Sequence, residues 1–280
     1  MIRNYLQTAL LAAAAESRYL VVLRETLYDE RISAAVEEFG FMRIGAFYAK
    51  ITIDRAGTCD ELSAFVSSIA VDSTYDALCQ KAISVLNAGD ASRDTSSLAA
   101  VERQLWPAKV VAPELRTFIV TIKPHWASHF FDVELGSQYL LGLREDLHLG
   151  VEGVYFRSAK NNNLRAPGRV LWYVSKGSGE GSMSVKACSQ LLDVVVGRPK
   201  DLFRRFQRLG VYEWRDVFAA AGNDSEKDIA AFRFGMTERF KTPVDTNFIS
   251  ELGVKGPFMS PREITDSQFA SIYRKGTGNA

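Results

Sequence analysis

The chain has 280 residues, of which 47% are hydrophobic and 24% charged, and its formal net charge is +1. Such a length and apolar fraction supply one large or two ordinary hydrophobic cores, so no stapling by disulfides or metals is required. Three scattered cysteines without a CxxC spacing indicate neither a disulfide framework nor a thiolate zinc site, and they fit a reducing cytoplasm. No apolar run reaches the ~18 residues that cross a bilayer, so we expect no membrane partner.

The charge is distributed unevenly. From Thr117 onward, 22 Lys and Arg stand against 18 Asp and Glu, whereas the preceding residues hold 12 against 15. The basic excess of the C-terminal part is a weak indication of a polyanionic ligand.

The first 57 residues are predicted to alternate helices and strands. Gly40 ends the second helix, because glycine tolerates left-handed backbone geometry there. This order resembles the second half of a GNAT acetyltransferase, with Gly40 and Phe41 at the turn after the last long helix. The predicted elements are helix 3–16, strand 19–23, helix 31–39 and strand 41–53.

The resemblance implies acetyl-CoA binding, yet the parts that handle this cofactor are not found. The family's pyrophosphate-binding loop is expected just ahead of Ile2, where the chain begins. Val36 stands where many of these enzymes carry a tyrosine that acts as general acid, and valine has no proton to give. Asp29 stands where they often have an asparagine. We therefore predict a truncated, structural GNAT-like half-domain over residues 1–57 without a cofactor. Its sheet edge needs a partner, which could be the next segment or a second copy of the chain, as in a homodimer.

Residues 58–116 carry little functional signal, and we interpret them as a helical linker region. Helices are predicted at residues 61–69, 75–86 and 98–105, and the breaker-rich stretch 87–97 is predicted as a loop or linker.

The next stretch places a basic residue at a structural corner. The β-branched run Thr117–Ile122 predicts a buried strand, and Pro124 suits the first turn of a helix, so Lys123 lies between strand and helix. Further strands are predicted at residues 153–157 and 169–175, with a polar loop at residues 160–163 between them.

A strand ending in Ile-Lys-Pro, a helix, a strand ending in Phe-Arg and a Val-Leu-Trp-Tyr strand resemble the ASCH and EVE branch of the PUA-like domains, over residues 117–280. The resemblance implies an α+β fold in which a PUA-like, ASCH-type β-barrel with flanking helices follows the GNAT-like half. It also implies a basic cleft that binds RNA or a single, often modified, base.

The first candidate nucleic-acid-binding group consists of Lys123, Trp126, Tyr155, Arg157 and Lys176. A cation beside an aromatic ring is the pairing that a flipped or single-stranded base requires, because the ring stacks on the base and the charge holds phosphate. The alternative puts Trp126 in the core, with Lys123 extending along the surface.

ASCH relatives that hydrolyse an acylated cytosine use a Lys-x-x-Glu-x-Arg strand. Aligned on Arg157, this chain has Glu152 at the lysine position and Tyr155 at the glutamate position. A tyrosine with its usual pKa is a poor base at neutral pH. We therefore predict no catalytic residue, and a binding protein rather than an enzyme.

His125 and His129 stand four residues apart on the predicted helix 124–131, a spacing that can chelate zinc. A third ligand would have to be supplied by a residue such as Asp132 or His148. Nothing else in the sequence requires a metal, so we predict none.

The strongest basic cluster surrounds a predicted helix that begins at Pro199 and ends at Gly210. Cations one turn apart can follow successive phosphates, and the forked guanidinium matches phosphate oxygens. The alternative is a solvated face neutralised by Asp201, Glu213 and Asp216. The basic residues are Arg198, Lys200, Arg204, Arg205 and Arg208. The buried face of the helix is predicted to be Leu202, Phe203, Phe206 and Leu209.

After this helix, Tyr212 and Trp214 are predicted to pack beneath it, and residues 229–234 to form a short strand. Thr265 and Gln268 have the spacing of a capping box that opens a last helix.

The sequence thus predicts a protein that binds nucleic acid, either RNA or single-stranded DNA, or a modified base. An alternative from another class is a GNAT-type N-acetyltransferase, toxin-like or nucleic-acid-modifying, whose missing half and acetyl-CoA site are completed by a partner chain. A third reading is a protein-binding regulator of a toxin–antitoxin or phage-defence operon, which no residue specifically supports.

Overall fold

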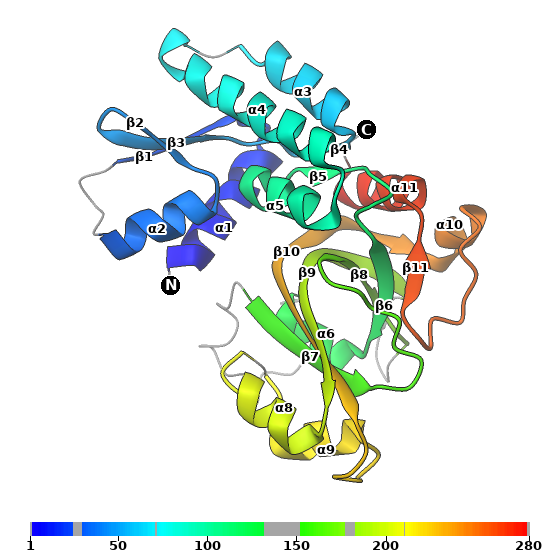
Figure 1. Ribbon diagram of the computed structural model, residues 1–280. Coiled ribbons are helices and arrows are strands. Elements are labelled where there is room, and N and C mark those ends of the chain that lie inside the picture. The colour runs from blue at the N-terminus through cyan, green and yellow to red at the C-terminus, as the bar shows by residue number, and fades with distance from the viewer. Residues whose placement is uncertain are drawn as a thin grey trace. The chain divides into compact units, whose positions relative to one another are not determined.

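The structure, a computed structural model, describes residues 2–24, 30–70, 72–131, 152–176, 183–209 and 211–278 (Figure 1). The N-terminal unit comprises residues 1–115 with 269–274 and 279–280, and the C-terminal unit comprises residues 116–268 with 275–278. Residues 58–115, interpreted above as a linker region, therefore lie in the same unit as residues 1–57. No helix in the described ranges combines the length and hydropathy needed to cross a membrane.

The N-terminal unit joins helices to a three-stranded antiparallel sheet of order β1-β3-β2, with α4 across it (Figure 1). A separate parallel pair is formed by β4 and β5. The elements are α1 (Ile2–Ala15), β1 (Leu20–Arg24), α2 (Glu30–Glu38), β2 (Met42–Ile44), β3 (Phe47–Ile51), β4 (Ala56–Gly57), α3 (Cys59–Ser68), the 3-10 helix Ser73–Tyr75, α4 (Asp76–Ser92), α5 (Thr95–Leu105) and β5 (Lys109–Val110).

Two predictions for this unit were wrong. Residues 41–53 form a hairpin rather than one strand, because Gly45 has a φ of +59° and turns the chain between β2 and β3. The polar stretch 87–97 is mostly helical. Asp94 accepts hydrogen bonds from the amides of Ser96 and Ser97, so residues that suggested a loop instead cap α5 directly after α4.

Lys50 of β3 is buried in this unit. Its neighbours Ala49 and Ile51 enter the core, and so does Lys50, whose side chain is 2% exposed. The Lys50 Nζ donates to the carbonyl of Phe39 at 2.5 Å. Burial, helped by the nearby charge of Lys109, lowers the pKa of Lys50 from 10.5 to about 7.

The C-terminal unit is built on a six-stranded sheet of order β11-β6-β8-β9-β10-β7, in which only β6 and β8 are parallel. Its elements are β6 (Thr117–Ile122), α6 (Pro124–Phe130), β7 (Glu152–Ser158), β8 (Gly168–Val174), β9 (Ser184–Gly197), α8 (Pro199–Phe206), α9 (Trp214–Ala220), β10 (Ile229–Asp245), α10 (Thr246–Glu251), β11 (Arg262–Ile264) and α11 (Asp266–Thr277), part of which belongs to the N-terminal unit. The short strand predicted at 229–234 is only the start of β10, which continues through several bulges.

The expected closed barrel is not found in the described part of the chain, because the strand order has two ends, β11 and β7. Side chains span the gap instead. The Tyr155 hydroxyl donates to the Thr121 carbonyl at 3.5 Å, and Arg157 Nη2 donates to the Met259 carbonyl at 3.1 Å. Thr121 Oγ1 donates to the carbonyl of Phe258. We call this set of side-chain contacts the seam: Tyr155 joins β7 to β6, and the loop at residues 258–259 is bonded to both strands.

Aromatic side chains fill the core of the C-terminal unit. Trp172 of β8 is fully buried, and its ring packs against Tyr155, Phe232 and Phe234. Such rings bury large apolar areas and therefore dominate the stability of a core. The capping box predicted for the last helix is confirmed by reciprocal hydrogen bonds between Thr265 and Gln268.

Candidate nucleic-acid interface

Lys123 and Lys176 lie at the same edge of the sheet. The parallel strands β6 and β8 end with Ile122 opposite Val174, and the Ser175 amide donates to the Ile122 carbonyl at 3.0 Å. Lys123 is the N-cap residue of α6, so the predicted strand-to-helix corner is present. Both lysines are exposed, and neither forms an ion pair with a described residue.

The two aromatic residues of the first candidate group differ in burial. Trp126 is partly buried and stacks on Tyr212 with ring centroids 4.1 Å apart. Tyr155 is 8% exposed, and its ring packs among Trp172, Tyr212 and Phe232. Burial raises the pKa of Tyr155 to about 12, so its hydroxyl stays protonated at neutral pH and is an even poorer base than an ordinary tyrosine. The Tyr155 ring is thus part of the core, and only its hydroxyl reaches the seam.

Arg157 sits beside Tyr155 at the seam. Its Nη2 is occupied by the Met259 carbonyl, whereas its Nε is buried and has no hydrogen-bond partner in the described structure. Burial lowers the pKa of the Arg157 guanidinium. A guanidinium always retains its charge in proteins, so Arg157 brings an incompletely satisfied cation to the seam.

The helix α8 follows the pattern that its sequence predicts, with one difference at its end. Pro199 occupies the first turn, and the face that contains Leu202 and Phe206 is buried. The helix ends at Phe206, so Arg208 lies in the following turn rather than in the helix. Gly210, the predicted end, falls outside the described residues.

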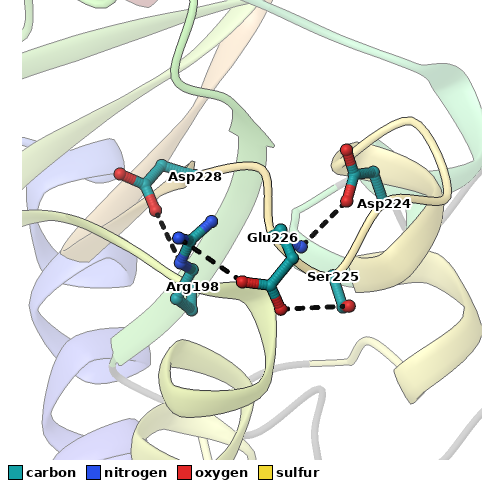
Figure 2. A network of polar contacts seen from close by, with 5 residues as sticks. All are labelled: Arg198, Asp224, Ser225, Glu226 and Asp228. Carbon is teal, nitrogen blue, oxygen red and sulfur yellow. Dashed lines mark hydrogen bonds and ion pairs between the residues drawn. The ribbon is translucent and has the colours of Figure 1, made fainter.

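Five cations around α8 divide into paired and unpaired groups. Arg198 lies 3.5 Å from Glu226 and 3.7 Å from Asp228, and Arg205 lies 3.5 Å from Asp193 (Figure 2 shows the Arg198 network). The remaining three are exposed and form no ion pair with any described residue. We call these three residues the α8 surface: Lys200, Arg204 and Arg208.

Two of the three carboxylates expected to neutralise this cluster make other contacts instead. Glu213 pairs with Arg215 at 3.1 Å, and Asp216 accepts a hydrogen bond from the Glu213 amide. Asp201 forms no ion pair within the described ranges. The residues that do the pairing, Asp193, Glu226 and Asp228, were missed by sequence reasoning, although the acidic run at 224–228 is visible in the sequence.

The predicted site residues form two groups rather than one. Lys123 and Lys176 adjoin the edge where Val174 pairs with Ser184, the first residue of β9. The cluster around α8 follows Gly197, the last residue of β9. The two groups therefore adjoin opposite ends of the same strand.

The two histidines of α6 are close together. The rings of His125 and His129 meet edge to face at 4.7 Å. The described residues contain no group of three or more side chains that could hold a metal ion. Asp132 and His148, the suggested third ligands, lie outside the described residues.

No protein-family model matches the chain, and no curated protein does. Solved structures show distant similarity. A serine-to-alanine mutant of an ASCH protein from Zymomonas mobilis is 15% identical, with a TM-score of 0.42 over 57% of this chain and 96% of that chain. The ASCH structure from the same organism is 16% identical, with a TM-score of 0.40 over 55% of this chain and 90% of that chain. The N-terminal domain of Staphylothermus marinus McrB is 14% identical, with a TM-score of 0.33 over 58% of this chain and 94% of that chain.

Proposed function

We propose that the C-terminal unit binds single-stranded nucleic acid, RNA or DNA, including strands that carry a modified base. The observation that carries the proposal is the α8 surface, whose three exposed cations lack carboxylate partners while Arg198 and Arg205 beside them are paired. Unpaired cations gathered on one surface favour a polyanionic ligand, because bound phosphates release their condensed counterions.

The spacing of these cations suits a phosphate backbone. Lys200 and Arg204 are one helical turn apart, a rise of about 6 Å, so they can contact successive phosphates of an extended strand. At the other end of β9, Lys123 adjoins the exposed His125 and the half-buried Trp126, whose rings lie 4.7 Å apart. This second group supplies the aromatic surface on which an unstacked base could rest.

Fluorescence anisotropy tests the proposal. Labelled single-stranded RNA, single-stranded DNA and duplex DNA are titrated with the protein at several salt concentrations. If three cations each neutralise one phosphate, the logarithm of the affinity for a single strand falls against that of salt with a slope of about −2. Absent binding, or binding that salt does not weaken, would contradict the proposal.

For the N-terminal unit we propose a structural or self-associating role without a cofactor. Within the described sheet, β1 and β2 are edge strands, and Val22 on β1 is 40% exposed. Unpaired edges invite strand addition from a second copy. The acetyltransferase alternative is tested by calorimetric titration with acetyl-CoA. We expect no heat of binding from this chain, whereas saturable binding would favour the alternative.

A further inference from the structure

The loop between α9 and β10 brings three carboxylates beside the basic cluster. We call Asp224, Glu226 and Asp228 the acidic loop. Figure 2 shows two of them converging on Arg198: Glu226 Oε2 lies 3.5 Å from Nη2, and Asp228 Oδ1 lies 3.7 Å from Nε. Asp224 contributes differently, since it accepts the Glu226 amide at 2.9 Å and so fixes the loop rather than the arginine.

These ion pairs are easily exchanged. The side chains of Arg198, Glu226 and Asp228 are 48%, 79% and 54% exposed. Water and salt screen pairs of this kind, and they contribute little to stability. A ligand that offers a better acceptor can therefore displace the carboxylates without disturbing the fold.

Arg198 is placed to meet the same ligand as the α8 surface. It is the N-cap residue of α8 and precedes Lys200 by two residues. A phosphate can engage its guanidinium through two parallel hydrogen bonds, which a pair of divergent carboxylates at 3.5 and 3.7 Å does not achieve.

We propose that the acidic loop competes with nucleic-acid phosphate for Arg198 and thereby weakens binding to the α8 surface. The inference rests on the proposed nucleic-acid function. A bound strand gains Arg198 as a fourth cation only by displacing Glu226 and Asp228, so the loop sets how strongly a ligand must bind before this contact forms.

The test is anisotropy with the full chain and labelled single-stranded RNA. Glu226→Gln combined with Asp228→Asn keeps the shape of both side chains and removes their charge. This variant is expected to bind about three- to tenfold more tightly at low salt, with the salt slope steeper by about 0.7 because one more phosphate is neutralised. Asp224→Asn removes a charge from the same loop but keeps the Oδ1 acceptor for the Glu226 amide, and residue 224 does not contact Arg198, so this variant should change the affinity less than twofold.

A double-mutant cycle assigns the gain to Arg198. Arg198→Ala alone should have little effect, because the arginine is already occupied, but in the Glu226→Gln, Asp228→Asn background it should abolish the gain. A gain that survives Arg198→Ala would overturn the inference, since it would reflect general repulsion by the loop. No gain in a protein that binds RNA would also overturn it. Absence of binding by the unmodified protein would instead defeat the proposed function itself, and the inference with it.

Discussion

Replacing Lys50 with methionine is expected to raise the free energy of unfolding at pH 7 by roughly 2–3 kcal/mol. The folded state holds this amine at a pKa of about 7, against an ordinary value of 10.5, so protonating it costs more in the folded chain than in the unfolded one. Each unit of that difference corresponds to about 1.4 kcal/mol, from which the lost hydrogen bond to Phe39 subtracts about 1–2 kcal/mol. Methionine retains the length and packing of the side chain without the charge.

The pH dependence of this gain identifies its cause. Below pH 7, Lys50 is protonated in both states, so the folded protein carries the whole cost. Above about pH 10.5 it is neutral in both, and the cost disappears. The stability gap between variant and parent should therefore narrow by about 1 kcal/mol per pH unit between pH 7 and 10. Urea unfolding of both proteins at pH 6.5, 8 and 9.5 measures this difference in the free energy of unfolding.

Lys81→Met is the matched control. Lys81 is exposed on α4, so the free energy of unfolding of the Lys81→Met variant should equal that of the parent protein at every pH. A Lys50 variant whose stability gap stayed constant with pH would show that the amine is not neutralised by burial.

Removing the α8 surface by the combined changes Lys200→Ala, Arg204→Ala and Arg208→Ala should weaken RNA binding about 10- to 100-fold at low salt. The loss follows from three missing phosphate contacts, and the salt slope should flatten by about 2. Anisotropy titrations at several salt concentrations give both quantities. Because these side chains are exposed and unpaired, the melting temperature should hardly change.

A second triple variant controls for net charge. Arg18→Ala, Lys81→Ala and Arg93→Ala remove the same three charges from exposed positions in the N-terminal unit. This variant should bind RNA nearly as the parent does. Equal losses in the two triple variants would mean that total charge, rather than the α8 surface, governs binding.

Local sequence patterns predicted the elements that carry the candidate site. The corner at Lys123 follows from a β-branched run before Pro124, and the buried face of α8 follows from its apolar spacing. Both features depend on residues adjacent in the chain, and such features can be read from one sequence.

The features that the sequence did not reveal depend on distant partners. Arg198 is paired with residues 28 and 30 positions further along, and no local pattern indicates that Glu226 and Asp228 reach it. Likewise, Tyr155 shows the alternation of any strand residue, and its burial depends on Trp172 and Tyr212 from other elements. The open barrel is a further example, because β7 and β11 lie at the two ends of the strand order, and such long-range strand pairing cannot be read from local sequence.

The seam has a mechanical consequence. Most joints in this sheet are ladders of backbone hydrogen bonds, which must break in series if two strands are to part. Among the described residues, the hydrogen bonds at the seam come from side chains: Tyr155 joins β7 to β6, and Arg157 and Thr121 join these strands to the loop at residues 258–259. Few hydrogen bonds oppose separation along that line, so the resistance there comes mainly from apolar side chains that the two strands bury together, such as Val120 of β6 and Phe156 of β7.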